Sequence, residues 1–127
     1  EQTRMLSRKS DMETVLLGDP ENVISKVRFY LKREQTGETV EITASPFLVG
    51  TESGSVTYCI SDNAAVSRKH AEFVLRDGYC TITDQKSTNK TYVNNIALTP
   101  YIAQKLSDGD QIRMANETFI FCQETQE

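Results

Sequence analysis

The stretch "AEFVLRDGYCTITD", residues 71–84, decides the fold because two alternating segments flank a tight turn. The apolar residues that share one face are Ala71, Phe73, Leu75, Cys80 and Ile82. Between the segments lies Asp77-Gly78, a pair typical of a type I′ turn, which needs positive φ at both central residues. The stretch therefore predicts a β-hairpin with one buried face.

The same alternation extends outward from this hairpin along the chain. Alternating or continuous apolar residues are found at 27–31, 40–44, 45–50, 111–114 and 118–121. Turn residues separate these segments, and no stretch has a convincing helical period. Short strands with regular turns in a 127-residue chain favour an all-β sandwich of two packed sheets.

Composition restricts the function classes. The net charge of −4 argues against general binding to nucleic acid or anionic membranes, which requires a basic surface. No apolar run reaches the ~18 residues of a membrane span, and no signal peptide is expected. The three cysteines fit no zinc pattern, and Cys80 and Cys122 are expected to be buried thiols in a reducing compartment.

The chain divides into three parts. Residues 1–25 are polar and charged and are expected to form a flexible tail. Residues 26–123 carry the strand pattern and are expected to form one domain, followed by a short C-terminal tail at 124–127. The chain starts with Glu1, so we interpret it as a piece of a longer protein.

Polar side chains concentrate in two loops, 62–69 and 84–90, which both lie at the open end of the predicted hairpin. Four cations there outnumber two acids: Arg68, Lys69, Lys86 and Lys90 against Asp62 and Asp84. Hydroxyl and amide groups are interleaved with them, at Ser67, Ser87, Thr88 and Asn89. This combination suits a compact anion with several acceptor oxygens, such as a phosphate monoester.

Three motifs from 46 to 95 resemble the forkhead-associated (FHA) domain family, which binds phosphothreonine peptides. They are "PFLVG", "VSRKHAEF" and "DQKSTNKTYVNN", and the likeness extends over residues 27–122. The resemblance implies an eleven-stranded β-sandwich of two twisted, mostly antiparallel sheets. Its apical loops are then expected to hold the peptide.

The resemblance also implies roles for individual residues. Ser67 and Thr88 are expected to hydrogen-bond the phosphate, Arg68 to add a charged contact, and Asn89 to fix the peptide main chain. The full expected binding set is Thr51, Ser67, Arg68, Lys86, Ser87, Thr88, Asn89 and Lys90. The residues expected to be structural are Gly50, His70, Thr91 and Asn94.

Two positions depart from the family pattern. Thr51 stands where an arginine usually contacts phosphate, and Lys90 stands where the family usually has glycine. A phosphate contact through Arg is worth roughly 1.5–3 kcal/mol, so its loss weakens the expected site. An alternative is therefore a scaffold module that binds an unphosphorylated partner. Two plainer interpretations also stand: Ser67 and Thr88 capping turns, and the cations forming a solvated rim.

Catalysis and metal binding are disfavoured, and no cofactor is expected. The chain has one histidine, and no nucleophile, base and orienting residue occur at a suitable spacing. The expected partners are a phosphothreonine protein or peptide and a Ser/Thr kinase, in the cytoplasm. Some bacterial family members are regulated by their own phosphorylated tail, and Thr14 in "DMETVLL" (11–17) is a candidate phosphosite.

Overall fold

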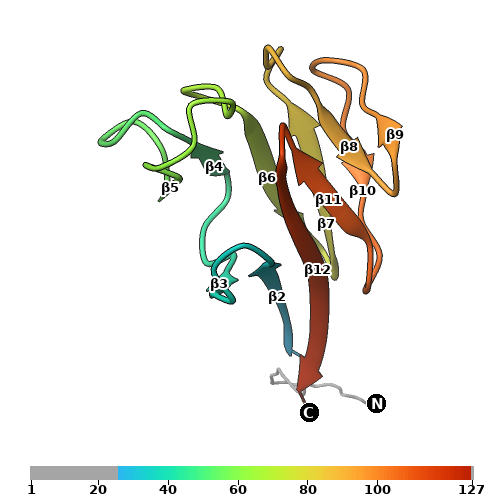
Figure 1. Cartoon of the computed structure of the whole chain (residues 1–127). Helices are drawn as coiled ribbons and strands as arrows, with labels where there is room; N and C mark the ends of the chain where they lie inside the picture. The colour runs from blue at the N-terminus through green and yellow to red at the C-terminus, as the bar shows by residue number, and fades with distance from the viewer. Residues whose placement is uncertain (1–25, 127) are drawn as a thin grey trace, which may run out of the picture.

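The computed structural model describes residues 26–126, and within them eleven strands form two packed sheets (Figure 1). Five strands make one sheet, in the order β10-β7-β6-β4-β5, and six make the other, in the order β3-β2-β12-β11-β8-β9. The first strands are β2 (Lys26–Arg33), β3 (Thr39–Glu41), β4 (Phe47–Gly50), β5 (Tyr58–Cys59), β6 (Ala71–Arg76) and β7 (Tyr79–Asp84). The remaining strands are β8 (Thr91–Val93), β9 (Ile96–Ala97), β10 (Gln104–Lys105), β11 (Gln111–Met114) and β12 (Glu117–Gln126). The predicted all-β sandwich is confirmed.

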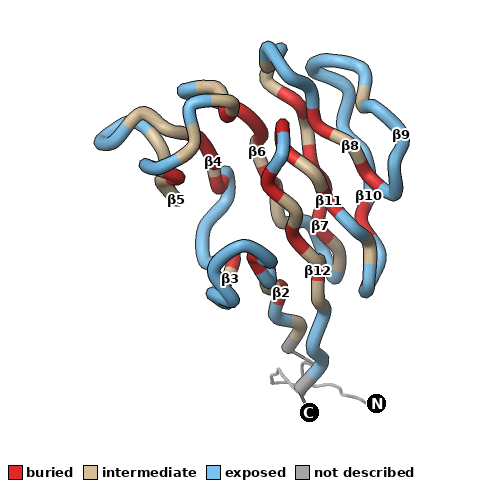
Figure 2. The backbone as a smooth tube through the Cα atoms, in the orientation of Figure 1, coloured by how far each residue is buried: buried red, intermediate tan, exposed pale blue. Residues whose placement is uncertain are grey.

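The core lies between the sheets and follows the period-two pattern of the sequence (Figure 2). Phe29 and Leu31 of β2 face the same interior as Phe119 and Phe121 of β12, and the rings of Phe29 and Phe121 stack with centroids 5.5 Å apart. Phe73 of β6 reaches this interior from the opposite sheet. The alternation thus places one large side chain inward at every second residue.

The tight turns adopt the backbone that their residues favour. Gly78 has φ of 80° in the β6–β7 turn, and Asn94 and Asn95 have φ of 51° and 69° between β8 and β9. The two-residue hairpin at Asp77-Gly78 is present, but Asp77 is not among the residues with positive φ, so the turn does not have the type I′ geometry expected from the sequence. The β11–β12 turn is an exception, because Ala115 has φ of 57° although alanine does not favour this region. The positive φ of Ala115 is therefore imposed by the rest of the fold and not by the preference of the residue itself.

The longest strand pair, β2 with β12, sets the long axis of the sandwich. Its register pairs Lys26 with Gln126 at one end and Arg33 with Phe119 near the other. The chain therefore enters and leaves the described domain at the same end (Figure 1). β12 runs to Gln126, so residues 124–126, expected as part of a C-terminal tail, continue the strand instead.

Three further expectations meet the structure. Cys80 is fully buried, but Cys122 is only half-buried, because it alternates with the inward-facing Phe121 and so points to the outer face of β12. Thr14 and the rest of 1–25 lie outside the described residues. Across 26–126, no helix has the length and apolar character that crossing a membrane requires.

Candidate functional site

Three loops meet at the end of the sandwich opposite the Asp77-Gly78 turn (Figure 1). The first loop, 51–57, follows β4; the second loop, 60–70, connects β5 to β6; the third loop, 85–90, connects β7 to β8. The Thr51 N–H donates to the Ser67 carbonyl at 3.1 Å, joining the first loop to the second. The Thr88 N–H donates to the Ser67 hydroxyl oxygen at 3.0 Å, joining the third loop to the second. The predicted convergence of these loops is present.

Gly50 permits the close approach of the first two loops. A Cβ at this position would lie 2.0 Å from the Arg68 carbonyl oxygen and 3.0 Å from the Ser67 carbonyl oxygen. Any side chain there would push the second loop away from β4. The glycine is therefore needed for space at the base of the site.

The loops enclose an open trough of about 1090 Å³, which we call the loop trough. Its lining residues are Thr51, Glu52, Ser61, Asp62, Asn63, Ala64, Ala65, Val66, Ser67, Arg68, Lys69, Thr88 and Asn89. Five of the eight residues expected to bind a phosphopeptide are in this lining: Thr51, Ser67, Arg68, Thr88 and Asn89. The structure therefore brings the larger part of the expected set to one surface.

The hydrogen bonds of Ser67 and Asn89 leave specific groups available to a ligand. Ser67 uses its hydroxyl oxygen to accept from the Thr88 N–H, so its hydroxyl hydrogen can be donated into the loop trough. Asn89 uses its side-chain nitrogen to donate to the Ala65 carbonyl at 2.8 Å, so its side-chain oxygen can still accept from a peptide N–H. One wall thus offers a donor suited to an anion beside an acceptor suited to a main chain.

His70 braces the second and third loops from below. Its Nδ1 accepts from the Ser67 N–H at 3.0 Å, so its Nε2 carries the proton and donates to the Lys90 carbonyl at 3.0 Å. Burial of the ring lowers the pKa of His70, and the Lys90 carbonyl and the Asp84 charge only partly oppose this effect. The ring is therefore neutral, with both nitrogens engaged in holding loops.

Asp84 organises the third loop from the end of β7. The carboxylate is buried and accepts from the Thr91 hydroxyl at 2.7 Å, and it also accepts from the backbone N–H and the hydroxyl of Ser87. Ser87 therefore points inward and is absent from the lining, although it was expected to contact the ligand. Asn94 lies further along, bonded to Asp110 and to the Gln111 N–H.

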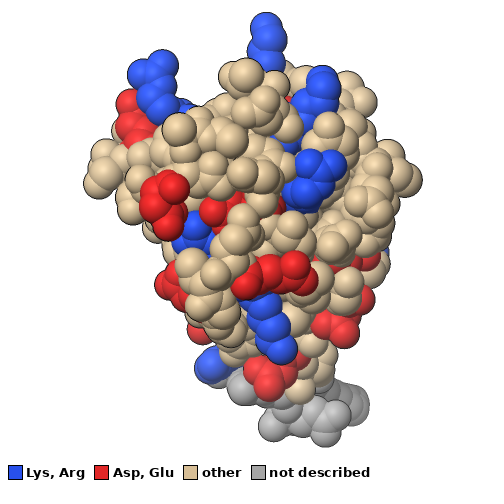
Figure 3. Space-filling model, viewed as in Figure 1, with Lys and Arg blue, Asp and Glu red and all other residues tan. Residues whose placement is uncertain are grey.

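The lysines of the third loop also stand outside the lining. Lys86 and Lys90 have φ of 59° and 68°, so both lie in the left-handed region that favours glycine, which is the residue that the family usually has at the position of Lys90. Both are exposed, and Figure 3 shows several lysine and arginine side chains spread over the top of the molecule, separated by uncharged surface. They contribute charge near the loop trough and do not form its wall.

Residues 61–66, which belong to the lining and which we call the floor of the loop trough, overlap the polar loop 62–69, but the sequence did not reveal how they are held. Asp62 there is bonded to Arg33 at 3.1 Å, and Arg33 pairs with Glu117 at 2.8 Å. A signal existed: Arg33 continues the inward alternation of Leu31, as Glu117 continues that of Phe119. Two opposite charges on inward positions of neighbouring strands indicate a buried ion pair.

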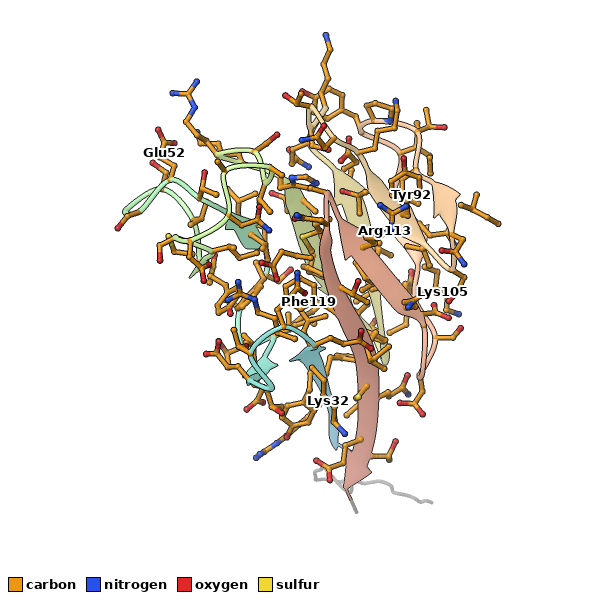
Figure 4. All side chains as sticks on the ribbon, in the orientation of Figure 1. Lys32, Glu52, Tyr92, Lys105, Arg113 and Phe119 are labelled. Atoms are coloured by element: carbon orange, nitrogen blue, oxygen red, sulfur yellow. The ribbon has the colours of Figure 1, made fainter. Side chains whose placement is uncertain are left out.

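Acidic groups also border the loop trough. Glu52, labelled in Figure 4, lies on the first loop and is half-buried in the lining. Its carboxylate and that of Asp62 offset Arg68 and Lys69, so the lining is less positive than the two loop sequences indicated. Within residues 26–126, no group of three or more His, Cys, Asp or Glu side chains is placed to hold a metal ion.

A family model and solved structures of other proteins point to the same family for this chain. The family model described as FHA domain matches residues 47–115. An FHA domain solved in a study of phosphothreonine-dependent interactions is 26% identical, with a TM-score of 0.67, and the match covers 75% of this chain and 95% of that one. Mycobacterium tuberculosis EmbR, solved with a low-affinity phosphopeptide, is 28% identical with a TM-score of 0.68, over 75% of this chain and 24% of EmbR.

Curated relatives match a shorter segment of 60 residues. The oxoglutarate dehydrogenase inhibitor of Corynebacterium glutamicum is 38% identical, and the match covers 47% of this chain and 40% of the relative. The glycogen accumulation regulator GarA of Mycolicibacterium smegmatis is 37% identical, over 47% of this chain and 36% of GarA. The chain thus matches about two fifths of the length of these relatives.

Proposed function

We propose that this chain, which belongs to the FHA domain family, binds phosphothreonine-containing protein segments in the loop trough and acts as a signalling adaptor. The observation that carries the proposal is the pairing of Ser67 with Asn89 on one wall, with a free hydroxyl donor beside a free amide acceptor. A phosphothreonine segment needs a donor for its phosphate and an acceptor for its main-chain N–H. Both lie in this wall.

The roles follow from these positions. The Ser67 hydroxyl and the Thr88 hydroxyl donate to the phosphate, and Arg68 and Lys69 supply positive charge from the exposed rim. Asn89 accepts from the main chain of the ligand and fixes its register. Thr51 lines the trough without the charge of an arginine, so the phosphate depends more strongly on Ser67 than it does in the usual family pattern.

The chemistry of the site supports binding without catalysis. His70 has both ring nitrogens in hydrogen bonds, so it is not available as a base. Burial raises the pKa of Cys80 to about 12, which removes it as a nucleophile. The matched relatives are named as an enzyme inhibitor and as a regulator, and both names fit a regulatory adaptor. We propose that this adaptor acts in a bacterial cytoplasmic pathway that contains a Ser/Thr kinase.

The chain's own Thr14 is the ligand that we propose for regulation. The 13 residues from Thr14 to Val27 reach at most ~45 Å when extended. A tethered ligand reaches an effective concentration in the millimolar range, so even a weak site is filled. A kinase that phosphorylates Thr14 then closes the loop trough to other partners.

Calorimetric titration of the 127-residue chain tests the binding function. The ligands are the peptide DMETVLL with phosphothreonine at Thr14, the unphosphorylated peptide and a phosphoserine version. We expect only the phosphothreonine peptide to bind, and Ser67→Ala to weaken it about ten-fold or more, as expected for a lost hydrogen bond to a charged group. Ser107→Ala, at an exposed site outside the lining, is the matched control and is expected to bind normally.

Two results would redirect the proposal. Equal binding of the phosphorylated and unphosphorylated peptides supports the scaffold alternative, in which Glu52 and Asp62 reflect a surface made for an unphosphorylated partner. The second result concerns the chain phosphorylated at Thr14. If it binds the phosphothreonine peptide as tightly as the unmodified chain does, regulation by the tail is contradicted and the binding function still stands.

A further inference from the structure

A buried ion pair lies behind the floor of the loop trough. Arg33 and Glu117 are 6% and 3% exposed and share two hydrogen bonds of 2.8 Å, one from Nε and one from Nη2. Removing both charges from water is costly, and well-packed apolar residues often stabilise a fold equally well. Fold stability alone is therefore a weak reason for such a pair, and its further contacts indicate what else it does.

Those contacts lead into the second loop. The side-chain nitrogen of Asn63 donates to Glu117 Oε2 at 3.0 Å and to Asn116 Oδ1 at 2.6 Å, while its oxygen accepts from the Ala65 N–H at 3.0 Å. Arg33 Nη2 donates to Asp62 Oδ1 at 3.1 Å. The ion pair and the turn beside it thus hold the trough floor at two adjacent residues.

From the floor, the connection continues to the residue proposed to bind the ligand's main chain. The Ala65 carbonyl accepts from the Asn89 side chain at 2.8 Å, so Ala65 is bonded on one side to Asn63 and on the other to Asn89. The same β11–β12 turn also reaches the third loop, because the Ala115 N–H donates to the Lys90 carbonyl at 3.2 Å. The second and third loops are therefore both held by the buried Arg33–Glu117 pair and the β11–β12 turn next to it.

We propose that Asn63 is a positioning residue for phosphopeptide binding: it links the buried Arg33–Glu117 pair to Ala65 and thereby holds Asn89 ready to accept from the ligand's main chain. The inference rests on the proposed function and adds a role for Asn63, which lines the loop trough but uses both ends of its side-chain amide within the protein, in bonds to Asn116, Glu117 and Ala65. A loop fixed before binding loses less conformational freedom on binding, which raises affinity.

The test compares Asn63→Ala with Asn94→Ala in the full chain. Asn94 is a close match, because its side chain also donates to a side-chain oxygen and accepts from a backbone N–H, and it is absent from the trough lining. We expect small losses of stability in urea for both variants, with the larger loss for Asn94→Ala, because alanine also disfavours the φ of 51° at this position. We expect Asn63→Ala to raise the Kd of the Thr14-phosphorylated DMETVLL peptide about three- to ten-fold, which is the effect of losing one ordinary hydrogen bond. We expect Asn94→Ala to leave this Kd unchanged.

A double-mutant cycle separates positioning from general loosening of the fold. If Asn63 acts through Asn89, adding Asn63→Ala to the Asn89→Ala variant does not raise the Kd of the peptide further, because the side chain that Asn63 positions is already absent. Asn94→Ala combined with Asn89→Ala gives the Kd of Asn89→Ala alone. Fully additive effects of Asn63→Ala and Asn89→Ala would overturn the inference.

A ligand-free measurement keeps the inference testable if no phosphothreonine peptide binds. Such a failure would count against the proposed function, and the positioning claim would then rest on the side-chain amide signals of Asn89 in ¹⁵N–¹H spectra. We expect Asn63→Ala to move these signals toward those of a free amide and Asn94→Ala to leave them in place. Unchanged Asn89 signals in Asn63→Ala would overturn the positioning claim by themselves.

Discussion

Replacing Gly50 by alanine tests how the base of the site is built. The added Cβ would lie 2.0 Å from the Arg68 carbonyl oxygen, and real Cβ contacts are not shorter than 3.0 Å, so β4 and the second loop must separate by about 1 Å. The atoms that the Cβ would meet are backbone atoms of Arg68 and Ser67, so no flexible side chain can move aside to relieve the contact.

The separation breaks identifiable hydrogen bonds. The Thr51 N–H to Ser67 carbonyl bond is 3.1 Å long and the Glu52 N–H to Arg68 carbonyl bond is 3.2 Å, so a further 1 Å removes both. Two lost hydrogen bonds together with the strain of overpacking amount to about 2–4 kcal/mol of unfolding free energy. Ser67 moves with its loop, so affinity for phosphothreonine falls as well.

Urea unfolding measures the effect against a matched glycine. Gly78→Ala adds the same methyl group where nothing lies within 4 Å, but at φ of 80°, so it reports backbone strain alone, about 1 kcal/mol. We expect Gly50→Ala to lose clearly more stability than Gly78→Ala. Equal losses would show that the close approach at Gly50 does not constrain the loops, and the reasoning would be refuted.

Three further predictions concern titration and backbone strain. The pKa of His70 is lowered on folding, so the unfolded chain takes up the proton first; the stability that neutral His70 provides is fully present above pH ~6.5 and falls as pH drops below it. Urea midpoints between pH 7.5 and 5.5 should show this fall, and His70→Gln should flatten it. Glu117→Gln leaves the Arg33 charge buried and partly unpaired, and should cost about 3 kcal/mol in the same assay at pH 7; no loss would contradict the buried pair. Lys90→Gly relieves a residue at φ of 68° and should raise the unfolding free energy by about 0.5 kcal/mol, whereas a decrease would mean that the lysine side chain is held by contacts.

The sequence predicted the fold well wherever local pattern and turn chemistry agree. The hairpin 71–84 follows from the alternation on either side of Asp77-Gly78, and this local feature does not depend on the rest of the chain. The convergence of Ser67 with Thr88 followed from the hairpin topology. A resemblance to a known family then supplied the roles.

The parts that escaped prediction depend on contacts between distant residues. The roles of Asp62 and Asn63 were not visible in the sequence, because their partners, Arg33 and Glu117, lie 29 and 54 positions away along the chain. Ser87 resembled Ser67 in the sequence, yet its hydroxyl turns to Asp84 and away from the loop trough. Neither the partner of a polar side chain nor its direction is fixed by composition or spacing.

The pairing of Lys26 with Gln126 has a consequence for how the domain can be joined to other polypeptide. Both chain connections leave from one end, while Arg33, seven residues along the same strand, already contacts the floor of the loop trough at the other end, about 23 Å away. Additional protein fused at either connection therefore adds its bulk far from the binding surface. The domain can therefore be inserted between larger domains without blocking the loop trough. A reporter group attached at Gln126 is expected to leave the access of ligands to the loop trough unchanged.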